Sequence, residues 1–155
     1  MSLIQIYKPN AKTSGHALSV SVNASPSKKD GRGIYIELIK QTTWDVNTKR
    51  GTFSGGDKIK LKFNEVEIAT IIDCVNSGRE AKFFHDSGTV TTSIGFKPWG
   101  ENGWSFSASQ SGVSYLMGLT FGEAEYIKQT LEFCLREIVA TDFYIEQEQF
   151  QNNSQ

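Results

Sequence analysis

Lysines occupy alternate positions at Lys58, Lys60 and Lys62, and the residues between them are apolar. Alternate side chains of an extended strand point to the same face, so this spacing predicts a row of ammonium groups opposite an apolar row. Like charges in such a row repel one another unless solvent or a polyanion lies above them. The row therefore favours phosphate binding, and the alternative is a solvated edge strand whose charges prevent aggregation.

Further cations and aromatic rings accompany this row. An unpaired nucleic-acid strand is held by cations on its phosphates and by rings that stack on its bases, at roughly 1 to 3 kcal/mol per base. Trp99, beside Pro98 and Gly100 in a turn, is expected to be exposed, whereas Trp104 alternates with Phe106 and is expected in the core. The predicted nucleic-acid contacts are Lys12, His16, Lys28, Lys29, Arg32, Tyr35, Trp44, Lys49, Arg50, Phe53, Lys58, Lys60, Lys62, Lys97 and Trp99.

The net charge of −1 conceals an uneven distribution along the 155 residues. From Met1 to Lys62, eleven Lys and Arg face four Asp and Glu, whereas from Phe63 onward five face thirteen. A basic half favours a polyanion as partner. The alternative is that the two halves neutralise each other in the folded protein.

No group of residues predicts catalysis. His85 and Asp86 are neighbours at the end of an expected strand, so their side chains should diverge and have structural roles. The segment from Gly51 to Lys58 faintly resembles a phosphate loop, but Asp57 stands where that motif requires lysine and would repel phosphates. We therefore expect no enzymatic activity and no cofactor.

Cys74 and Cys134 lie sixty positions apart, each within a helical apolar pattern. This placement favours buried packing thiols over a disulfide or a zinc site. No apolar run approaches the ~20 residues that cross a bilayer, and the start of the chain resembles neither a signal nor a transit peptide. We expect an intracellular, cytoplasmic protein of a bacterium or a virus-infected cell.

The elements that must position these residues follow from periodicity. Alternation and β-branched residues predict strands at Gly15–Asn23 and Ile34–Gln41, a weaker one around Trp44 or Phe53, and one at Lys58–Phe63. Asn64 and Glu67 have capping-box spacing before an apolar helical stripe that includes Ile68, Ile71, Ile72 and Val75, and Gly78 closes this helix.

Four further strands are expected before a second helix. They lie at Lys82–His85, Thr89–Lys97, Gly103–Ser109 and Val113–Leu119. Thr120 and Glu123 repeat the capping-box spacing, and the second helix should run to about Val139, burying Ala124, Ile127, Leu131, Cys134 and Ile138. The fold class is therefore α+β with antiparallel sheets. Residues 1–143 should form one domain and 144–155 a disordered acidic and polar tail.

Three segments resemble the Whirly family of single-stranded DNA-binding proteins, which belongs to the superfamily of the transcriptional coactivator positive cofactor four. Gly15–Val20 resembles the family's Lys-Gly-Lys-Ala-Ala-Leu strand, and Phe63–Val66 resembles its Leu-Ser-Pro-Thr-Glu-Val helix start. Lys82–Asp86 resembles its Glu-Phe-Phe-His-Asp run almost residue for residue. The resemblance implies two antiparallel four-stranded β-sheets, each followed by a helix.

The resemblance also implies a homotetramer, with a dimer as the alternative, that holds an unpaired strand across its sheet surfaces. His16 replaces a basic residue of the family, so its contribution to phosphate binding should depend on pH. The characteristic C-terminal ending of the plant proteins is missing, as is a transit peptide, which favours a bacterial or viral relative.

The leading functional prediction is sequence-tolerant single-stranded DNA binding in replication, recombination or repair. RNA binding or annealing, or transcriptional regulation, by the same fold is the first alternative. A more distant alternative is a protein-interaction or carbohydrate-binding domain in which Trp99, Trp104 and Tyr115 stack on sugars. Binding that weakens steeply with salt would argue against sugar recognition.

Overall fold

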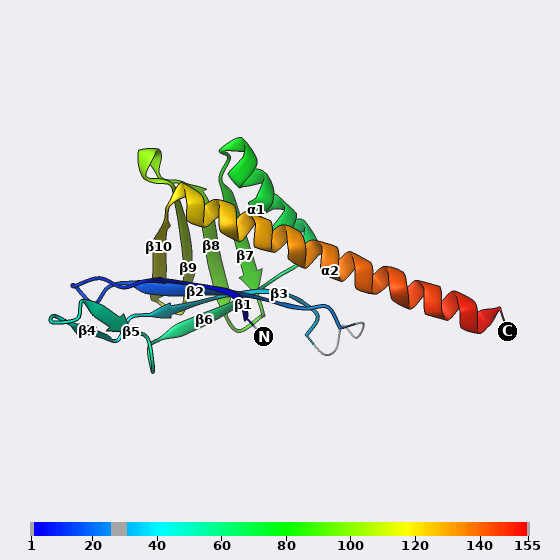
Figure 1. The fold of residues 1–155 in the computed structure, drawn as a ribbon, viewed down its shortest axis with the longest axis horizontal. Coiled ribbons are helices and arrows are strands. Elements are labelled where there is room, and N and C mark those ends of the chain that lie inside the picture. Colours follow the sequence, from blue (N-terminus) through cyan, green and yellow to red (C-terminus); the bar gives the residue numbers. More distant parts are fainter. Residues whose placement is uncertain (1, 26–30, 155) are drawn as a thin grey trace.

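A computed structural model describes residues 2–25 and 31–154, and it contains two four-stranded antiparallel sheets (Figure 1). The N-terminal sheet has the order β1 (Ser2–Lys8), β2 (His16–Asn23), β3 (Gly33–Lys40), β6 (Lys58–Phe63). The C-terminal sheet has the order β10 (Val113–Leu119), β9 (Trp104–Gln110), β8 (Thr91–Pro98), β7 (Ala81–Asp86). The helices are α1 (Glu65–Ser77) and α2 (Phe121–Asn153), and each follows one sheet in sequence. The predicted fold class is confirmed.

One strand of the N-terminal sheet differs from the prediction. β1, which was not predicted, pairs with β2 through register partners such as Ile4 with Val20. The weak strand expected around Trp44 or Phe53 instead belongs to a separate hairpin of β4 (Thr43–Asp45) and β5 (Arg50–Thr52). These strands have only three residues each, too few to form another full strand of the sheet.

The core lies where the two sheets and the helices meet. The N-terminal sheet buries the face that carries Ile36, Leu38 and Leu61, while the alternate residues of β6 stay exposed. In the C-terminal sheet, the rings of Phe96 and Trp104 stack with centroids 4.9 Å apart. Trp104 is thus a core residue, as predicted.

Both helices begin at the predicted capping boxes. The side chain of Asn64 accepts a hydrogen bond from the Glu67 amide at 2.8 Å, and the Glu67 carboxylate accepts one from the Asn64 amide at 3.1 Å. Thr120 and Glu123 make the same reciprocal pair. Such pairs satisfy amide groups that have no partner within the helix.

The two cysteines are free and buried in the helices, as expected. Cys74 lies on the buried stripe of α1 and Cys134 on that of α2. Burial raises the pKa of the Cys134 thiol to about 11. This thiol is therefore protonated at neutral pH and is a poor nucleophile.

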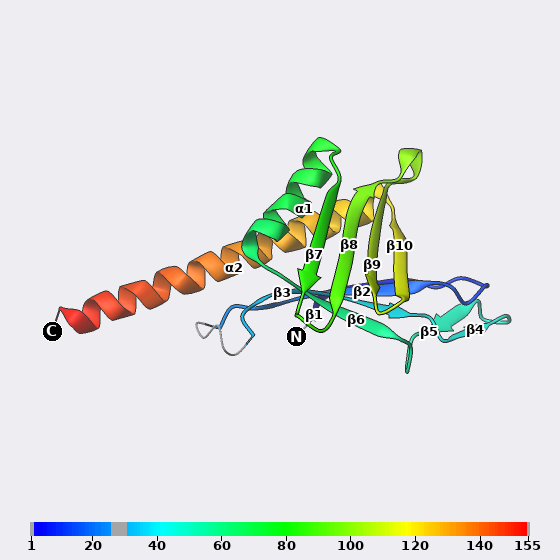
Figure 2. The same ribbon diagram turned by 180° about the vertical axis from the view of Figure 1, so that it is seen from behind.

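The predicted end of the second helix is wrong. α2 continues past Val139 to Asn153, so most of the segment expected to be a disordered tail is helical. The chain beyond Gly122 contains no glycine or proline, and its Glu and Gln residues favour helix. The distal part of α2 projects beyond both sheets (Figures 1 and 2). No helix in the described part of the chain is long and apolar enough to span a membrane.

Candidate nucleic-acid interface

The predicted lysine row lies on the open side of the N-terminal sheet. Lys58, Lys60 and Lys62 are exposed, while the residues between them on β6 are buried, as predicted. Tyr35 of β3 is the register partner of Lys62 and shares this side of the sheet. We call the surface formed by Tyr35, Lys58, Lys60 and Lys62 the lysine face.

Tyr35 is held in place within the lysine face. Its hydroxyl donates a hydrogen bond to the Gly31 carbonyl, and the Lys60 ammonium lies 4.8 Å from the ring centroid. A cation this close to a ring is attracted by the ring's electron density. The lysine face thus combines fixed aromatic and cationic groups on one rigid strand pair.

The β4–β5 hairpin adds more cations at one end of the N-terminal sheet (Figure 1). Lys49 and Arg50 are exposed at its turn, and Trp44 is half-buried opposite Gly51. Phe53, the remaining predicted contact in this region, is half-buried, and its ring centroid lies 5.6 Å from that of Tyr7. Tyr7 was not predicted as a site residue because β1 was not predicted as a strand.

Gln41 anchors the turn that carries Lys12. Its buried side chain accepts hydrogen bonds from the Asn10 amide at 2.9 Å and the Gly15 amide at 3.1 Å. It donates to the carbonyls of Asn10 at 3.0 Å and Thr43 at 2.9 Å. These bonds join the β1–β2 turn to the start of the hairpin, so exposed Lys12 stands on a fixed loop.

Arg32 has a structural role rather than a free charge. Its guanidinium lies 2.6 Å from the Asp142 carboxylate and 3.6 Å from that of Glu65, and only 12% of its side chain is exposed. Arg32 thus joins the start of β3 to both helices.

The predicted contacts Lys28 and Lys29 lie outside the described residues.

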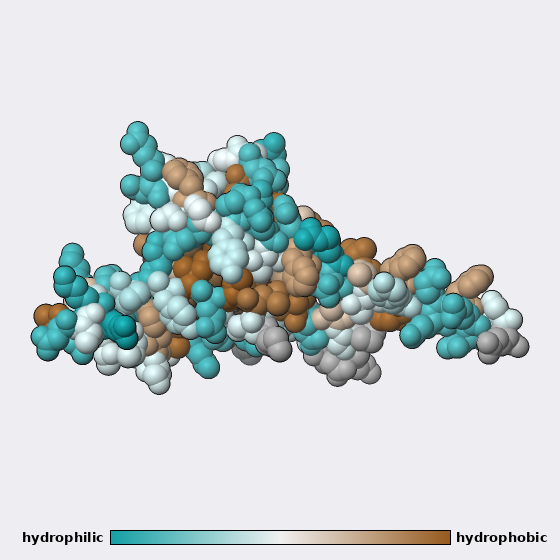
Figure 3. All heavy atoms as spheres, viewed as in Figure 1, coloured by the Kyte–Doolittle hydropathy of each residue, from teal (hydrophilic) through white to brown (hydrophobic). Residues whose placement is uncertain are grey.

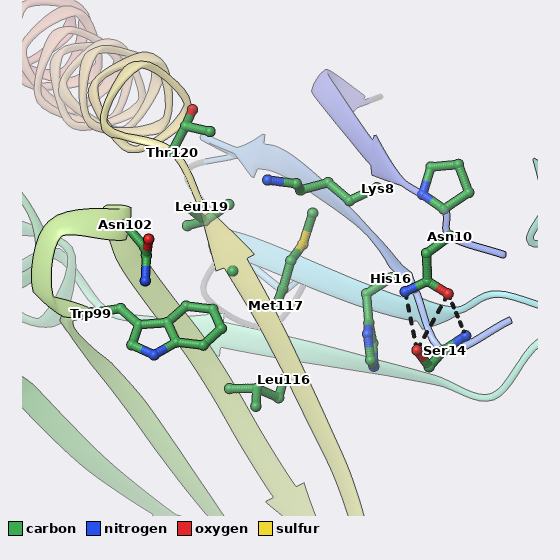
Figure 4. A pocket seen from close by; sticks show the side chains of 13 residues that line it. Lys8, Asn10, Ser14, His16, Trp99, Asn102, Leu116, Met117, Leu119 and Thr120 are labelled. Carbon is green, nitrogen blue, oxygen red and sulfur yellow. Dashed lines mark hydrogen bonds between the residues drawn. The ribbon is translucent and has the colours of Figure 1, made fainter. Parts of the chain in front are cut away.

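His16 lies in a groove of about 350 Å³ where the β1–β2 turn meets β10. Figure 4 shows Lys8 and His16 on one side of this groove and Trp99 and Leu116 on the other. Trp99 is 50% exposed, as predicted from its turn. The groove therefore offers an indole ring opposite an ammonium group.

The imidazole of His16 is uncharged at neutral pH. Burial, followed by the effect of the Lys40 ammonium, lowers its pKa below the usual value of 6.5. Its Nε2 is buried and has no hydrogen-bond partner among the described residues. His16 is thus a cation only in acid, or when an anion is bound beside it.

The outer face of the C-terminal sheet carries a shallow trough that the sequence did not reveal. Its floor has small side chains because the register aligns serines and a glycine across the strands. The trough has a volume of about 370 Å³, and Phe84 and Leu116 are exposed along it. We call this surface the serine strip; it comprises Phe84, Ser93, Gly95, Ser107, Ser109, Ser114 and Leu116.

The serine strip continues into the His16 groove. The two surfaces share Leu116, and Lys97 is exposed on the same side of β8 as Gly95. Near the lysine face, Lys60 and Lys62 line a separate hollow with Asp86, and none of its lining residues belongs to the serine strip. The serine strip therefore joins Trp99, whereas the lysine face is a surface of its own.

The predicted divergence of His85 and Asp86 is confirmed. The Nε2 atom of His85 lies 2.7 Å from the Glu67 carboxylate, while the Asp86 carboxylate accepts a hydrogen bond from the Gly88 amide. His85 therefore ties β7 to the start of α1. Residues 2–25 and 31–154 contain no cluster of three or more His, Cys, Asp or Glu side chains placed to hold a metal ion.

Comparison with solved structures identifies the architecture. The crystal structure of WHY3 from Arabidopsis thaliana matches with a TM-score of 0.66 and 15% sequence identity, over 94% of this chain and 92% of that one. The fold is Whirly-like. WHY1 from the same plant matches with a TM-score of 0.60 and 16% identity, over 100% of this chain and 95% of that one. No family model matches the sequence, and no curated protein sequence is significantly similar to it.

The Whirly-like fold divides the predicted contacts among separate places. The lysine face holds four of them, the hairpin region another four, the His16 groove holds His16 and Trp99, and Lys97 lies on the outer side of β8. The prediction missed Phe84 and Leu116. Two signals could have found this surface: the period-two serines of β9, and the exposed position of Phe84 next to the inward-facing Phe83.

Proposed function

We propose that this protein binds single-stranded DNA with little dependence on base sequence and catalyses no reaction, in replication, recombination or repair. The lysine face carries the proposal, because it places three exposed lysines in a row on one sheet surface, with the Lys60 ammonium over the Tyr35 ring. Contacts of this kind to phosphates and bases need no base-reading helix. The resemblance of three sequence segments to the Whirly family supports the same function.

The lysine face and the serine strip suggest how the strand lies. Phosphates contact the lysine face, and bases lie on the serine strip, where small floor residues leave room for flat rings. Phe84 on the serine strip and Trp99 in the adjoining His16 groove are exposed and offer stacking partners. Bases are thereby held by shape and stacking rather than by hydrogen bonds that read their edges.

Fluorescence anisotropy of labelled oligonucleotides tests this function. Single-stranded DNA, duplex DNA and RNA of equal length and several base compositions are titrated at a series of salt concentrations. We expect tight, salt-sensitive binding to single strands of any composition, and weak binding to the duplex. Absence of binding to any single strand at low salt would refute the proposal.

RNA binding or annealing, or regulation of melted promoters, by the same surface is the second candidate. It rests on the same lysine face, because phosphates are common to both polymers. The ratio of DNA to RNA affinity in that titration decides between them. Sugar binding is less favoured, because two of the three rings expected to stack on sugars, Trp104 and Tyr115, are buried.

Self-association is part of the proposal, with a homotetramer favoured over a dimer. The projecting part of α2 exposes Val139, Phe143 and Tyr144, with between 56% and 67% of each residue accessible. These side chains line one apolar hollow on the helix. A helix with an exposed apolar stripe is stabilised when the stripe is covered by another chain. Sedimentation of the wild type, and of a variant with Val139 and Phe143 changed to serine, tests this contact.

A further inference from the structure

β1 is an edge strand whose outer side has no partner among the described residues. It pairs with β2 on one side only, and it stands first in the N-terminal sheet. α2 packs against the core face of β1 and β2, where Lys8 meets Glu123 at 2.7 Å. The backbone groups along the outer edge therefore remain free to pair with another strand.

Folded proteins usually protect such an edge, as two other edge strands of the four-stranded sheets show. β6 carries three lysines, and β7 carries charged residues at both ends, Lys82 and Asp86. β1 has none of these protections, since its only charged residue, Lys8, is paired with Glu123 at the strand's end.

The sequence of β1 is complementary to itself when two copies run antiparallel. With Gln5 opposite Gln5 of a second copy, Ile4 faces Ile6 on the core side and Leu3 faces Tyr7 on the open side. No like charges meet in this register. The register irregularity of β1 falls between Ser2 and Ile4, so the segment that makes the central pairs is regular.

Apolar surface surrounds this edge. Figure 1 looks onto the β1 side of the N-terminal sheet, and Figure 3 shows in the same view that apolar surface gathers between α2 and the sheet. Leu3 at the start of the edge is 38% exposed, and Ile4 and Ile6 are each 8% exposed. A second copy paired at the edge would remove this apolar surface from water.

We propose that two copies of this chain pair through their β1 strands, antiparallel about a two-fold axis at Gln5. The pairing joins two N-terminal sheets into one eight-stranded sheet and places the two lysine faces on the same side of it. It uses residues different from the α2 stripe, so the two contacts are separable. The pairing requires no nucleic acid, so it can be tested independently of single-strand binding.

A charge exchange at the two-fold axis tests the pairing. Gln5→Lys places two ammonium groups opposite each other, and Gln5→Glu does the same with carboxylates. We expect sedimentation to give half the wild-type mass for either variant alone and the full mass for their equimolar mixture. Ser19→Lys, on the neighbouring strand and the register partner of Gln5, is the matched control and should keep the full mass.

Three results would overturn the proposal: full mass for either Gln5 variant alone, half mass for the mixture, or half mass for Ser19→Lys. Gln5 is exposed, so thermal unfolding should show that the variants remain folded. Should a charged variant fail to fold, the cross-link below provides an independent measurement.

Directly opposed residues of antiparallel strands have Cα atoms about 4.5 to 5.5 Å apart, within reach of a disulfide. Gln5→Cys should therefore give a covalent dimer under mild oxidation, seen on a non-reducing gel. Ser19→Cys is the control: its mate would lie three strand spacings away, roughly 14 Å, and the native thiols are buried. A monomeric Gln5→Cys, or equal cross-linking of both variants, would refute the pairing.

Discussion

The lysine face and the serine strip occupy equivalent positions in two halves of similar design. Each lies on the solvent side of a four-stranded sheet whose other side is buried against a helix. One exposes three lysines on a single strand, and the other exposes serines flanked by Phe84 and Leu116. The same architecture thus presents one surface suited to phosphates and another suited to bases.

The two surfaces also reflect the uneven distribution of charge along the chain. The basic excess before Phe63 is displayed by β6, the hairpin and the β1–β2 turn. The acidic excess after it lies partly on the helices, where Asp142 and Glu65 pair with Arg32 and Glu67 pairs with His85. The halves therefore neutralise each other only in part, and on the lysine face Glu37, the register partner of Lys60, offsets one of the three lysine charges.

Removing the lysine face should have the largest effect. Each phosphate contact to a single strand contributes about 0.7 to the slope of log affinity against log salt, so changing Lys58, Lys60 and Lys62 to alanine should reduce that slope by about 2. Anisotropy titrations at several salt concentrations measure the slope. The control changes Arg79, which is exposed just after α1 and away from the lysine face, to alanine and should leave the slope unchanged. An unchanged slope in the lysine variant would show that the phosphates bind to another surface.

Phe84→Ala tests the serine strip by itself. The side chain is 71% exposed, so stability should change by less than about 0.5 kcal/mol. If a base stacks on this ring, affinity should fall by roughly 1 to 3 kcal/mol with the salt slope unchanged. Val113→Ala, at the far end of β10, is the control for loss of an exposed apolar group. Equal affinity of wild type and Phe84→Ala would confine the nucleic acid to the lysine face.

Local patterns predicted the parts of this molecule that depend on neighbouring residues. The capping boxes at Asn64 and Thr120, and the alternation of β6, are set within a few positions and were predicted correctly. β1 was missed because its short Ile4 and Ile6 alternation has no β-turn signal on its N-terminal side. The ion pair of Arg32 with Asp142 joins residues far apart in sequence, which periodicity does not register. Of the serine strip, only the alternating serines of β9 are visible locally, because their alignment with β8 and β10 depends on the register of the sheet.

Gly118→Ala should give a smaller change that is limited to the His16 groove. An added Cβ atom at this position would lie 2.6 Å from the Trp99 ring, so the indole must move from its place beside the groove. We expect a change in tryptophan emission and a loss of affinity no larger than the roughly 1 to 3 kcal/mol that one stacked ring contributes. Gly122→Ala, whose added Cβ atom would approach nothing closer than the Thr120 hydroxyl at 4.0 Å, is the comparison. Identical emission of Gly118→Ala and wild type would show that the indole does not depend on Gly118.

Protonation of His16 should have the smallest effect, and it should lower the stability of the folded chain but raise its affinity for single strands. Burial and the nearby Lys40 ammonium lower the pKa of His16 in the folded chain, so the unfolded chain binds a proton at higher pH. Stability should therefore fall as pH decreases through the ordinary histidine value of about 6.5, and level off below the folded-state pKa.

A bound phosphate beside His16 favours the charged imidazole, so affinity for single strands should rise over the same fall in pH. Urea unfolding and anisotropy at about pH 7.5 and about pH 5.5 measure the two trends, and His16→Gln should weaken both. The difference between wild type and variant separates His16 from every other titrating group. If His16→Gln removes the rise in affinity at low pH, a phosphate of the bound strand lies in the His16 groove, which adjoins the serine strip through Leu116. Parallel pH trends in the two proteins would confine the phosphates to the lysine face and leave the strip to the bases alone.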